Sequence, residues 1–120
     1  MGLKVYYYDK CGTCKKALKW LDERVVGYML HPIREKPPTK KELKEALKAV
    51  GDSRKLFNVS GQDYRKMDLK SRLPSMSDAE RIDLLAQNGN LIKRPFVVGD
   101  GVRLVGFDAE TWAEALGGWR

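Results

Sequence analysis

The stretch that decides the fold is Tyr8–Leu21, with the sequence YDKCGTCKKALKWL. It follows a run of β-branched and aromatic residues, Val5–Tyr8, which predicts a strand. After a short turn, apolar side chains recur at i, i+3, i+4 and i+7, a spacing that predicts an amphipathic helix. These apolar positions are Cys14, Ala17, Leu18 and Leu21. The spacing therefore places Cys14 on the buried face of the helix and leaves Cys11 in the loop ahead of it.

The two cysteines of this CGTC motif should differ chemically. Cys11 lies where the unpaired N–H groups of a first helical turn and the helix dipole favour a thiolate. Lowering a thiol pKa from about 8.5 to about 6.5 needs about 2.7 kcal/mol, and a helix terminus contributes about 0.3 to 2. Lys10, Lys15 and Lys16, or further hydrogen bonds, must contribute the remainder. Cys14, one turn on, suits a resolving thiol that closes a disulfide with Cys11.

Three other interpretations of the motif remain open. A structural disulfide between Cys11 and Cys14 would close a very small loop and stabilise the chain little. A zinc site needs four ligands, and His31 is the only histidine in the sequence, so no metal site is predicted. Both thiols being inert is the third alternative. A strand followed by CxxC at a helix start is nevertheless typical of redox motifs.

Length and composition favour one globular domain over residues 1–120. The chain is 42% hydrophobic and 32% charged, as in ordinary globular proteins. No apolar run approaches membrane-spanning length, and the N-terminus lacks a signal-peptide pattern. Two neighbouring thiols without an export signal favour a reducing, cytoplasmic setting. We expect no membrane association.

The net charge of +7 is concentrated in the half of the chain that carries the cysteines. Residues 1–60 hold 14 Lys and Arg against 7 Asp and Glu, whereas residues 61–120 hold 9 of each. A positive field would attract an anion such as glutathione, an oxyanion or an acidic protein surface. The alternative is a solvated lysine face that serves solubility. Direct nucleic-acid binding is not expected, because no helix-turn-helix signature accompanies the lysines.

The remaining elements predict a mixed α/β fold. Val25–His31 predicts a second strand parallel to the first, and Leu91–Val98 and Val102–Val105 predict a hairpin. Two capping boxes, beginning at Thr39 and Ser77, start helices in the intervening segment. Further helical signals are weaker between residues 53 and 76, where Tyr64–Leu69 suggests a short helix. A last helix follows Asp108.

The order is therefore β-α-β, a helical insertion over about residues 37–90, and β-β-α. A parallel pair plus a hairpin makes one mixed four-stranded sheet. With CxxC at the first strand–helix junction, this arrangement resembles a thioredoxin-like fold. The sequence is similar, over nearly its whole length, to the arsenate reductase–Spx family. The residues that carry this resemblance are Tyr8–Lys16 (YDKCGTCKK), Leu69, Leu91–Val98 (LIKRPFVV) and Gly106-Phe107.

The resemblance implies a catalytic set of Cys11, Cys14 and Arg94, with Cys11 as nucleophile. It implies a cis Arg94–Pro95 bond that holds the Arg94 backbone near Cys11, with the Arg94 side chain on the thiolate or a bound anion. Thr13, Lys15 and Pro95 would surround the bound thiol. The alternative for Arg94 is a surface ion pair.

Departures from the family pattern bear on the substrate. Arsenate reductases of this family place two further arginines around the oxyanion, where this chain has Asn58 in one segment and Gly106-Phe107 in the other. Three guanidinium groups would bind an arsenate through paired hydrogen bonds. Arg65 and Arg103 are the candidates to replace the missing pair. Those reductases also lack a cysteine at position 14.

The sequence thus favours a cysteine-based thiol–disulfide or glutathione-linked reductase. No cofactor is expected to stay bound, and glutathione or another thiol would be the reductant. Expected partners are glutathione, glutaredoxin or a thiol-bearing protein. One alternative is a redox-sensing regulator of the Spx type, which binds the RNA polymerase α subunit and carries a basic C-terminal extension where this chain stops at Arg120. The other is an arsenate reductase.

Overall fold

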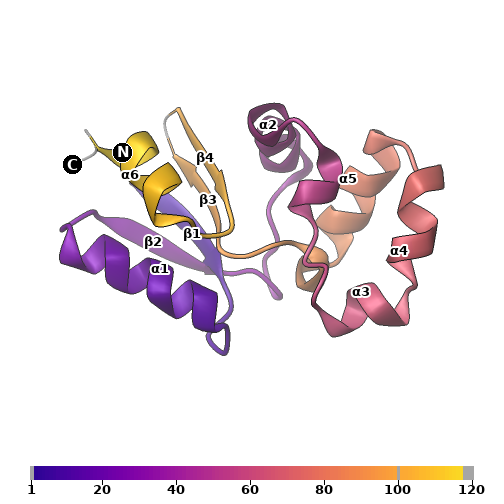
Figure 1. Ribbon diagram of the computed structural model, residues 1–120, viewed down its shortest axis with the longest axis horizontal. Coiled ribbons are helices and arrows are strands. Elements are labelled where there is room, and N and C mark those ends of the chain that lie inside the picture. Colours follow the sequence, from indigo (N-terminus) through magenta and orange to yellow (C-terminus); the bar gives the residue numbers. More distant parts are fainter. Residues whose placement is uncertain (1, 100, 118–120) are drawn as a thin grey trace.

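The four strands of the chain form one mixed sheet. The computed structural model describes residues 2–99 and 101–117. The strands are β1 (Leu3–Tyr7), β2 (Tyr28–Pro32), β3 (Phe96–Gly99) and β4 (Val102–Val105). They lie in the order β2-β1-β3-β4, with β2 parallel to β1 and the other neighbours antiparallel. The α/β class, the mixed sheet and the thioredoxin-like order of elements are therefore confirmed (Figure 1).

Six α-helices and three short 3-10 helices surround this sheet within the described residues. The α-helices are α1 (Gly12–Glu23), α2 (Lys40–Val50), α3 (Gln62–Lys66), α4 (Leu69–Arg72), α5 (Asp78–Gln87) and α6 (Ala109–Leu116). The 3-10 helices are η1 (Ser53–Leu56), η2 (Leu73–Ser75) and η3 (Gly89–Leu91). The elements from α2 to η3 form the insertion, which follows β2 and precedes β3 in the sequence. In Figure 1, α3, α4 and α5 lie beyond one end of the sheet. None of the described helices has the length and apolarity to cross a membrane.

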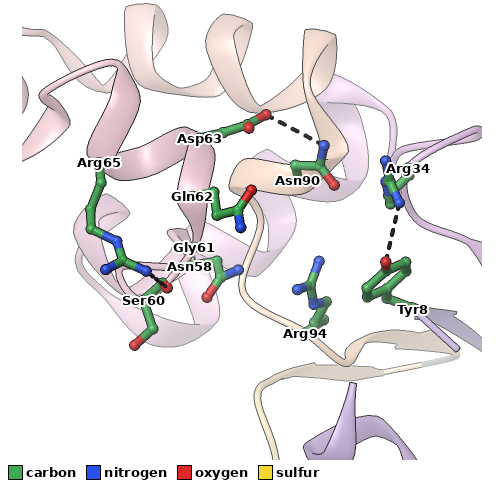
Figure 2. Close-up of a pocket in the computed structure, with 10 residues that line it drawn as sticks. All are labelled: Tyr8, Arg34, Asn58, Ser60, Gly61, Gln62, Asp63, Arg65, Asn90 and Arg94. Carbon is green, nitrogen blue, oxygen red and sulfur yellow. Dashed lines mark hydrogen bonds between the residues drawn. The ribbon is translucent and has the colours of Figure 1, made fainter. Parts of the chain in front are cut away.

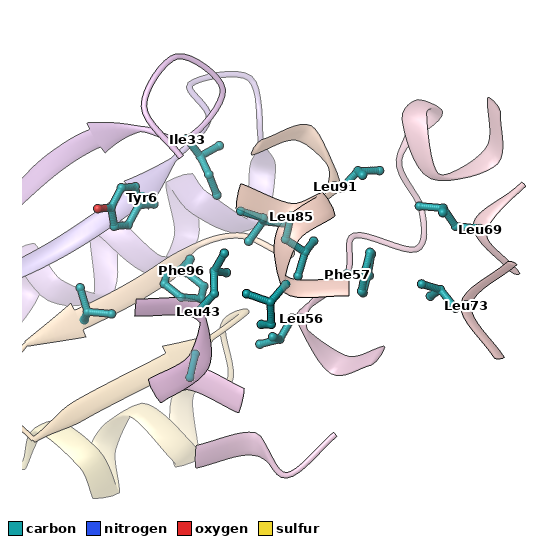
Figure 3. Packing of buried hydrophobic residues seen from close by; sticks show 14 residues of the cluster. Tyr6, Ile33, Leu43, Leu56, Phe57, Leu69, Leu73, Leu85, Leu91 and Phe96 are labelled. Carbon is teal, nitrogen blue, oxygen red and sulfur yellow. The ribbon is translucent and has the colours of Figure 1, made fainter. Parts of the chain in front are cut away.

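The alternation of side chains along the strands builds a hydrophobic cluster on each face of the sheet. Leu3 and Val5 point to the face covered by α1 and α6, where Trp20, Leu21 and Trp112 are also buried. Tyr6, Phe96 and Val98 point to the opposite face, where they join apolar side chains of the insertion (Figure 3). Alternate residues along the strands thus contact the helices on the two opposite faces of the sheet.

The predicted second strand begins too early. The structure starts β2 at Tyr28 rather than at Val25. Val25 is exposed, with φ +57°, and the N–H of Val26 donates to the Leu21 carbonyl, so this segment continues the turn after α1. β2 also includes Pro32, which an edge strand tolerates because the missing N–H can face away from the sheet.

The predicted third strand also begins too early. Leu91 lies in η3, and β3 starts only at Phe96. The intervening residues pair with the insertion instead: the Lys93 N–H donates to the Leu56 carbonyl, and the Asn58 N–H donates to the Leu91 carbonyl. This β-prone segment therefore pairs with a loop of the insertion rather than with the sheet.

Both capping boxes are confirmed, at Thr39 and at Ser77. The helix suggested for Tyr64–Leu69 is wrong in its bounds, because α3 ends at Lys66 and Asp68 adopts φ +51° before α4 begins. Asp108 caps α6 as predicted. Part of the predicted Gly99-Asp100-Gly101 turn, at Asp100, lies outside the described residues, as does Arg120.

Candidate active site

Cys11 occupies the N-cap position of α1. Its backbone is extended, with φ −95° and ψ 117°, and its Sγ accepts a hydrogen bond from the Cys14 N–H at 3.4 Å. The Cys11 N–H donates to the Tyr8 carbonyl, and the Cys11 carbonyl accepts from the Lys15 N–H. These backbone bonds fix the thiol at the helix start, where free N–H groups point outward. The Cys11 side chain is partly exposed.

The surroundings of Cys11 favour its thiolate. Burial by itself raises the pKa of Cys11, but hydrogen bonds from Cys14 and the Arg94 guanidinium outweigh burial and lower the pKa below its ordinary value. The Coulombic attraction of Arg94 acts in the same direction. The lysines expected from the sequence are not among these main contributions. The stabilisation of the thiolate therefore comes first from Cys14 within the motif, and then from Arg94, which is more than 80 positions away in the chain.

Cys14 is the opposite case. Only 1% of its side chain is exposed, on the inner face of α1. Burial raises the pKa of the Cys14 thiol to about 12, and the neighbouring Cys11 sulfur adds to this shift. Cys14 is therefore protonated at neutral pH while Cys11 is the more acidic thiol. The two cysteines are free thiols in this structure.

Arg94 reaches the site from the segment that precedes β3. The Arg94–Pro95 peptide bond is cis, as the family resemblance implies. The guanidinium carbon of Arg94 lies 4.7 Å from the ring centroid of Tyr8, a cation–π contact. The ion pairs among the described residues do not involve Arg94. The alternative of a surface ion pair is therefore not what the structure contains.

A groove of about 460 Å³ surrounds the Cys11 thiol. We call it the Cys11 groove; it is lined by Cys11, Thr13, Asn58, Ser60, Lys93, Arg94, Val105, Gly106, Phe107 and Asp108. Thr13 lines this groove together with Cys11. Lys15 is exposed and Pro95 is buried, and neither lines this groove. Their predicted contact with a thiol stays a prediction.

The two positions where the resemblance implies further arginines both face the groove. Asn58 stands at one of them, and Gly106-Phe107 at the other. Gly106 has φ +76°, its N–H donates to the Pro95 carbonyl, and its carbonyl accepts from Trp112 Nε1 at 3.1 Å. Arg94 and Lys93 are therefore the cationic side chains that line the groove.

The structure separates the two arginines that were candidates to replace the missing pair. Arg103 forms an ion pair with Glu45 at 3.0 Å and does not line the Cys11 groove. Arg65 lines a second cavity, which adjoins the Cys11 groove and also contains Arg34 and Arg94. Arg34 and Tyr8 were not predicted as site residues.

A topological signal could have found Arg34 and Tyr8. Parallel strands end at the same edge of a sheet, and ligands commonly bind outside that edge. Because β1 ends at Tyr7 and β2 at Pro32, the residues that follow each strand lie close together. Arg34 Nη1 accordingly donates to the Tyr8 hydroxyl at 3.2 Å. Within residues 2–99 and 101–117, no three His, Cys, Asp or Glu side chains gather to hold a metal ion.

Known proteins share both the sequence and the shape of this chain. The uncharacterized protein YusI of Bacillus subtilis is 44% identical over 95% of this chain and 98% of its own length. A structure from Bacteroides fragilis, described as ArsC family related, is 42% identical, covers 96% of this chain and 99% of that one, and gives a TM-score of 0.89. A possible arsenate reductase of Streptococcus mutans is 38% identical, covers 89% and 92%, and gives 0.83.

More distant relatives include transcriptional regulators. The global transcriptional regulator Spx of Streptococcus pyogenes is 28% identical over 88% of this chain and 78% of that protein. The model of the ArsC family matches residues 6–115, which include all the strands and helices except the first residues of β1 and the last residue of α6. The expected resemblance is therefore confirmed. This chain belongs to the ArsC family.

Proposed function

We propose that this protein is a thiol–disulfide reductase linked to glutathione, with Cys11 as nucleophile and Cys14 as resolving thiol. The observation that carries the proposal is the inequality of the two thiols. Cys11 opens into a groove and has a lowered pKa, whereas Cys14 is buried one turn behind it with a pKa of about 12. The thiolate is the attacking species, so Cys11 reacts first.

The reaction is two successive thiol–disulfide exchanges. In the first, the Cys11 thiolate attacks one sulfur of a substrate disulfide, forms a mixed disulfide and releases the other sulfur as a thiolate. In the second, Cys14 loses its proton to the departing thiolate and attacks the Cys11 sulfur. The substrate leaves as a second thiol, and Cys11 and Cys14 are joined. The protein has then lost two electrons, which glutathione or glutaredoxin returns.

Arg94 assists the first exchange in this proposal. Its charge lowers the pKa of Cys11 and so favours the attacking thiolate. Once the mixed disulfide forms, Cys11 is neutral and the guanidinium is free to bind an anionic group of the substrate. Thr13, Lys15 and Pro95 retain their proposed role around the bound thiol.

Arsenate reduction has less support. An arsenate needs several guanidinium or other donors around its oxygens. Asn58 and Gly106 occupy the Cys11 groove where the resemblance implies arginines, so Arg94 is the arginine that lines it. An amide and a glycine supply no guanidinium, so the paired hydrogen bonds that three arginines would give an arsenate are missing.

The relationship to Spx supports a second candidate, a redox-sensing regulator. A regulator would use the same cysteine pair as a sensor and would bind the RNA polymerase α subunit in one redox state. This role requires stable binding of the subunit rather than rapid turnover. The lowered pKa of Cys11 suits either role, so the distinction rests on turnover.

One assay separates the three functions. Purified protein is supplied with glutathione disulfide and a dithiol reductant in one arm, and with arsenate, glutathione and glutaredoxin in the other. We expect disulfide consumption that depends on Cys11, and no arsenite. Arsenite formation would overturn the ranking. Failure in both arms, with redox-dependent capture of the purified polymerase α subunit, would establish the regulator instead.

A further inference from the structure

A second cavity of about 540 Å³ adjoins the Cys11 groove. We call it the arginine cavity; its lining is Tyr8, Arg34, Asn58, Ser60, Gly61, Gln62, Asp63, Arg65, Asn90 and Arg94 (Figure 2). Asn58, Ser60 and Arg94 line both hollows and form the wall between them. The volume lies within the range of about 300–1,000 Å³ that is typical of small-molecule sites. A ligand attached at Cys11 can therefore extend past Arg94 into this cavity.

Three guanidinium groups line the arginine cavity without a carboxylate partner among the ion pairs of the described residues. Arg34 is held by the Tyr8 hydroxyl, and Arg65 Nη2 donates to the Ser60 carbonyl at 3.2 Å. Arg94 lies against the Tyr8 ring. Each is thus positioned by a neutral group and keeps further N–H donors for a ligand.

One carboxylate shares the cavity. Asp63 Oδ2 accepts hydrogen bonds from Asn88 and Asn90 at 3.1 and 3.4 Å, and these amides hold the side chain in place. The lining therefore carries three positive charges and one negative charge. The amides of Asn58 and Gln62 lie between Arg65 and Arg94 in Figure 2 and offer both donors and acceptors. This arrangement is suited to a ligand with more than one carboxylate and one ammonium.

We propose that the arginine cavity binds the charged ends of a glutathionyl group whose sulfur lies at Cys11. A glutathionyl group carries two carboxylates and one ammonium, which complements the three arginines and Asp63. This inference rests on the proposed reductase function and deepens it: the preferred substrate is a small anionic disulfide. Arg34 and Arg65 are specificity-determining residues in this assignment, because they contact the substrate away from the reacting sulfurs.

The backbone of the cavity is built for a close approach. An ideal Cβ on Gly89 would lie 1.8 Å from the Ile33 carbonyl oxygen and 3.2 Å from the Arg34 Cα. Only a residue without a side chain lets η3 lie against the segment that carries Arg34. This contact brings Asn90 and Arg34, from two distant segments of the chain, into one lining.

The test measures selectivity in a Cys14→Ser background, where the first exchange stops at the mixed disulfide. The rate of Cys11 modification is compared for glutathione disulfide, for neutral hydroxyethyl disulfide and for cystamine, which carries ammonium groups but no carboxylate. We expect Arg65→Gln and Arg34→Gln each to lower the ratio of the glutathione rate to the hydroxyethyl rate about tenfold. Arg72→Gln is the matched control, since Arg72 lies on the same insertion outside the cavity.

The outcomes separate this inference from the proposed function. If Cys11 reacts with none of the three disulfides, the reductase function fails. If Cys11 reacts with all of them and the ratio is the same in Arg65→Gln, Arg34→Gln and Arg72→Gln, the cavity assignment alone is overturned. A preference for cystamine over glutathione disulfide would also overturn it, because the site would then select a cation.

Discussion

The Cys11 groove and the arginine cavity share a wall but differ in how they are assembled. The reactive sulfur is fixed by the first turn of one helix, four residues from the end of β1. The cavity instead gathers residues from the end of β1, the end of β2 and the helical insertion. Arg94 belongs to both. The difference teaches that the position of the reactive sulfur is set locally, whereas recognition depends on how three segments dock, so variants should affect the two separately.

The largest effect should come from the sulfur itself. Cys11→Ser replaces the thiolate with a hydroxyl that does not attack disulfides, and we expect the rate of disulfide consumption to fall by at least about 1,000-fold. Cys14→Ser is the matched variant, because it removes only the resolving thiol. It should keep the first exchange and accumulate the mixed disulfide.

Mass spectrometry of the intact protein measures both results. A glutathionyl adduct should appear on Cys14→Ser and be absent from Cys11→Ser. An adduct on Cys11→Ser would assign the attack to Cys14 and would reverse the roles proposed for the pair.

The placement of the two cysteines was predictable from the sequence, because its determinants are local. The N-cap position of Cys11 and the burial of Cys14 follow from residue spacing within one helix. Arg94 and its cis peptide bond followed from the family resemblance. Of the two expected sources of thiolate stabilisation, lysines or further hydrogen bonds, the structure contains the second: Cys14 and Arg94 lower the pKa of Cys11, and the neighbouring lysines are not among the main contributions. Charge near in sequence is easily solvated, while a partly buried guanidinium acts through less water.

The cavity was not predictable by the same means. Arg34 and Arg65 carry no local pattern that distinguishes them from surface arginines, and Arg103 appeared an equal candidate until the structure paired it with Glu45. The same limitation explains the strand that was predicted to begin at Leu91. Composition alone does not distinguish pairing with a sheet from pairing between loops, and here the Lys93 N–H bonds to the insertion.

The second effect tests the docking of these segments. Gly89→Ala should lower the free energy of unfolding by about 2–3 kcal/mol, because an added methyl group meets the Ile33 carbonyl and the backbones must separate. Gly27→Ala is the control: it is exposed, and nothing lies within 4 Å of its added Cβ. Its change should stay within about 0.5 kcal/mol.

Urea unfolding followed by circular dichroism gives both values. In the folded fraction of Gly89→Ala, the selectivity for glutathione disulfide should also fall, because the Arg34 segment is displaced. Equal unfolding midpoints for the two alanine variants would show that the close approach at Gly89 does not hold the cavity together.

The third effect concerns the shared wall. Arg94→Gln removes the charge that lowers the pKa of Cys11, so the pKa should rise toward the ordinary value of about 8.5. Below its pKa a thiol is mostly protonated and slow to react. Alkylation of Cys11 by iodoacetamide should therefore slow about three- to tenfold at pH 7, and the variant should match the native rate at high pH.

The alkylation rate is measured from pH 5 to 10 in the Cys14→Ser background. Lys15→Gln removes the same charge from an exposed side chain beside the motif, and its profile should shift less. An equal shift in the two variants would restore the lysines as the source of the thiolate, and would contradict the role assigned to Arg94.

The smallest effect should come from Tyr8, which touches Arg34 of the arginine cavity and Arg94 of the wall. Tyr8→Phe removes the hydroxyl that accepts from Arg34 but keeps the ring against Arg94. A solvent-exposed hydrogen bond from the Arg34 guanidinium, worth about 1 kcal/mol, is lost, so the preference for glutathione disulfide over hydroxyethyl disulfide should fall about two- to fivefold while the Cys11 alkylation profile is retained. Tyr8→Leu removes the ring as well and should move that profile to higher pH. If Tyr8→Phe alone moved the profile, Arg34 would act on the sulfur, and reactivity and recognition would not be separable across this wall.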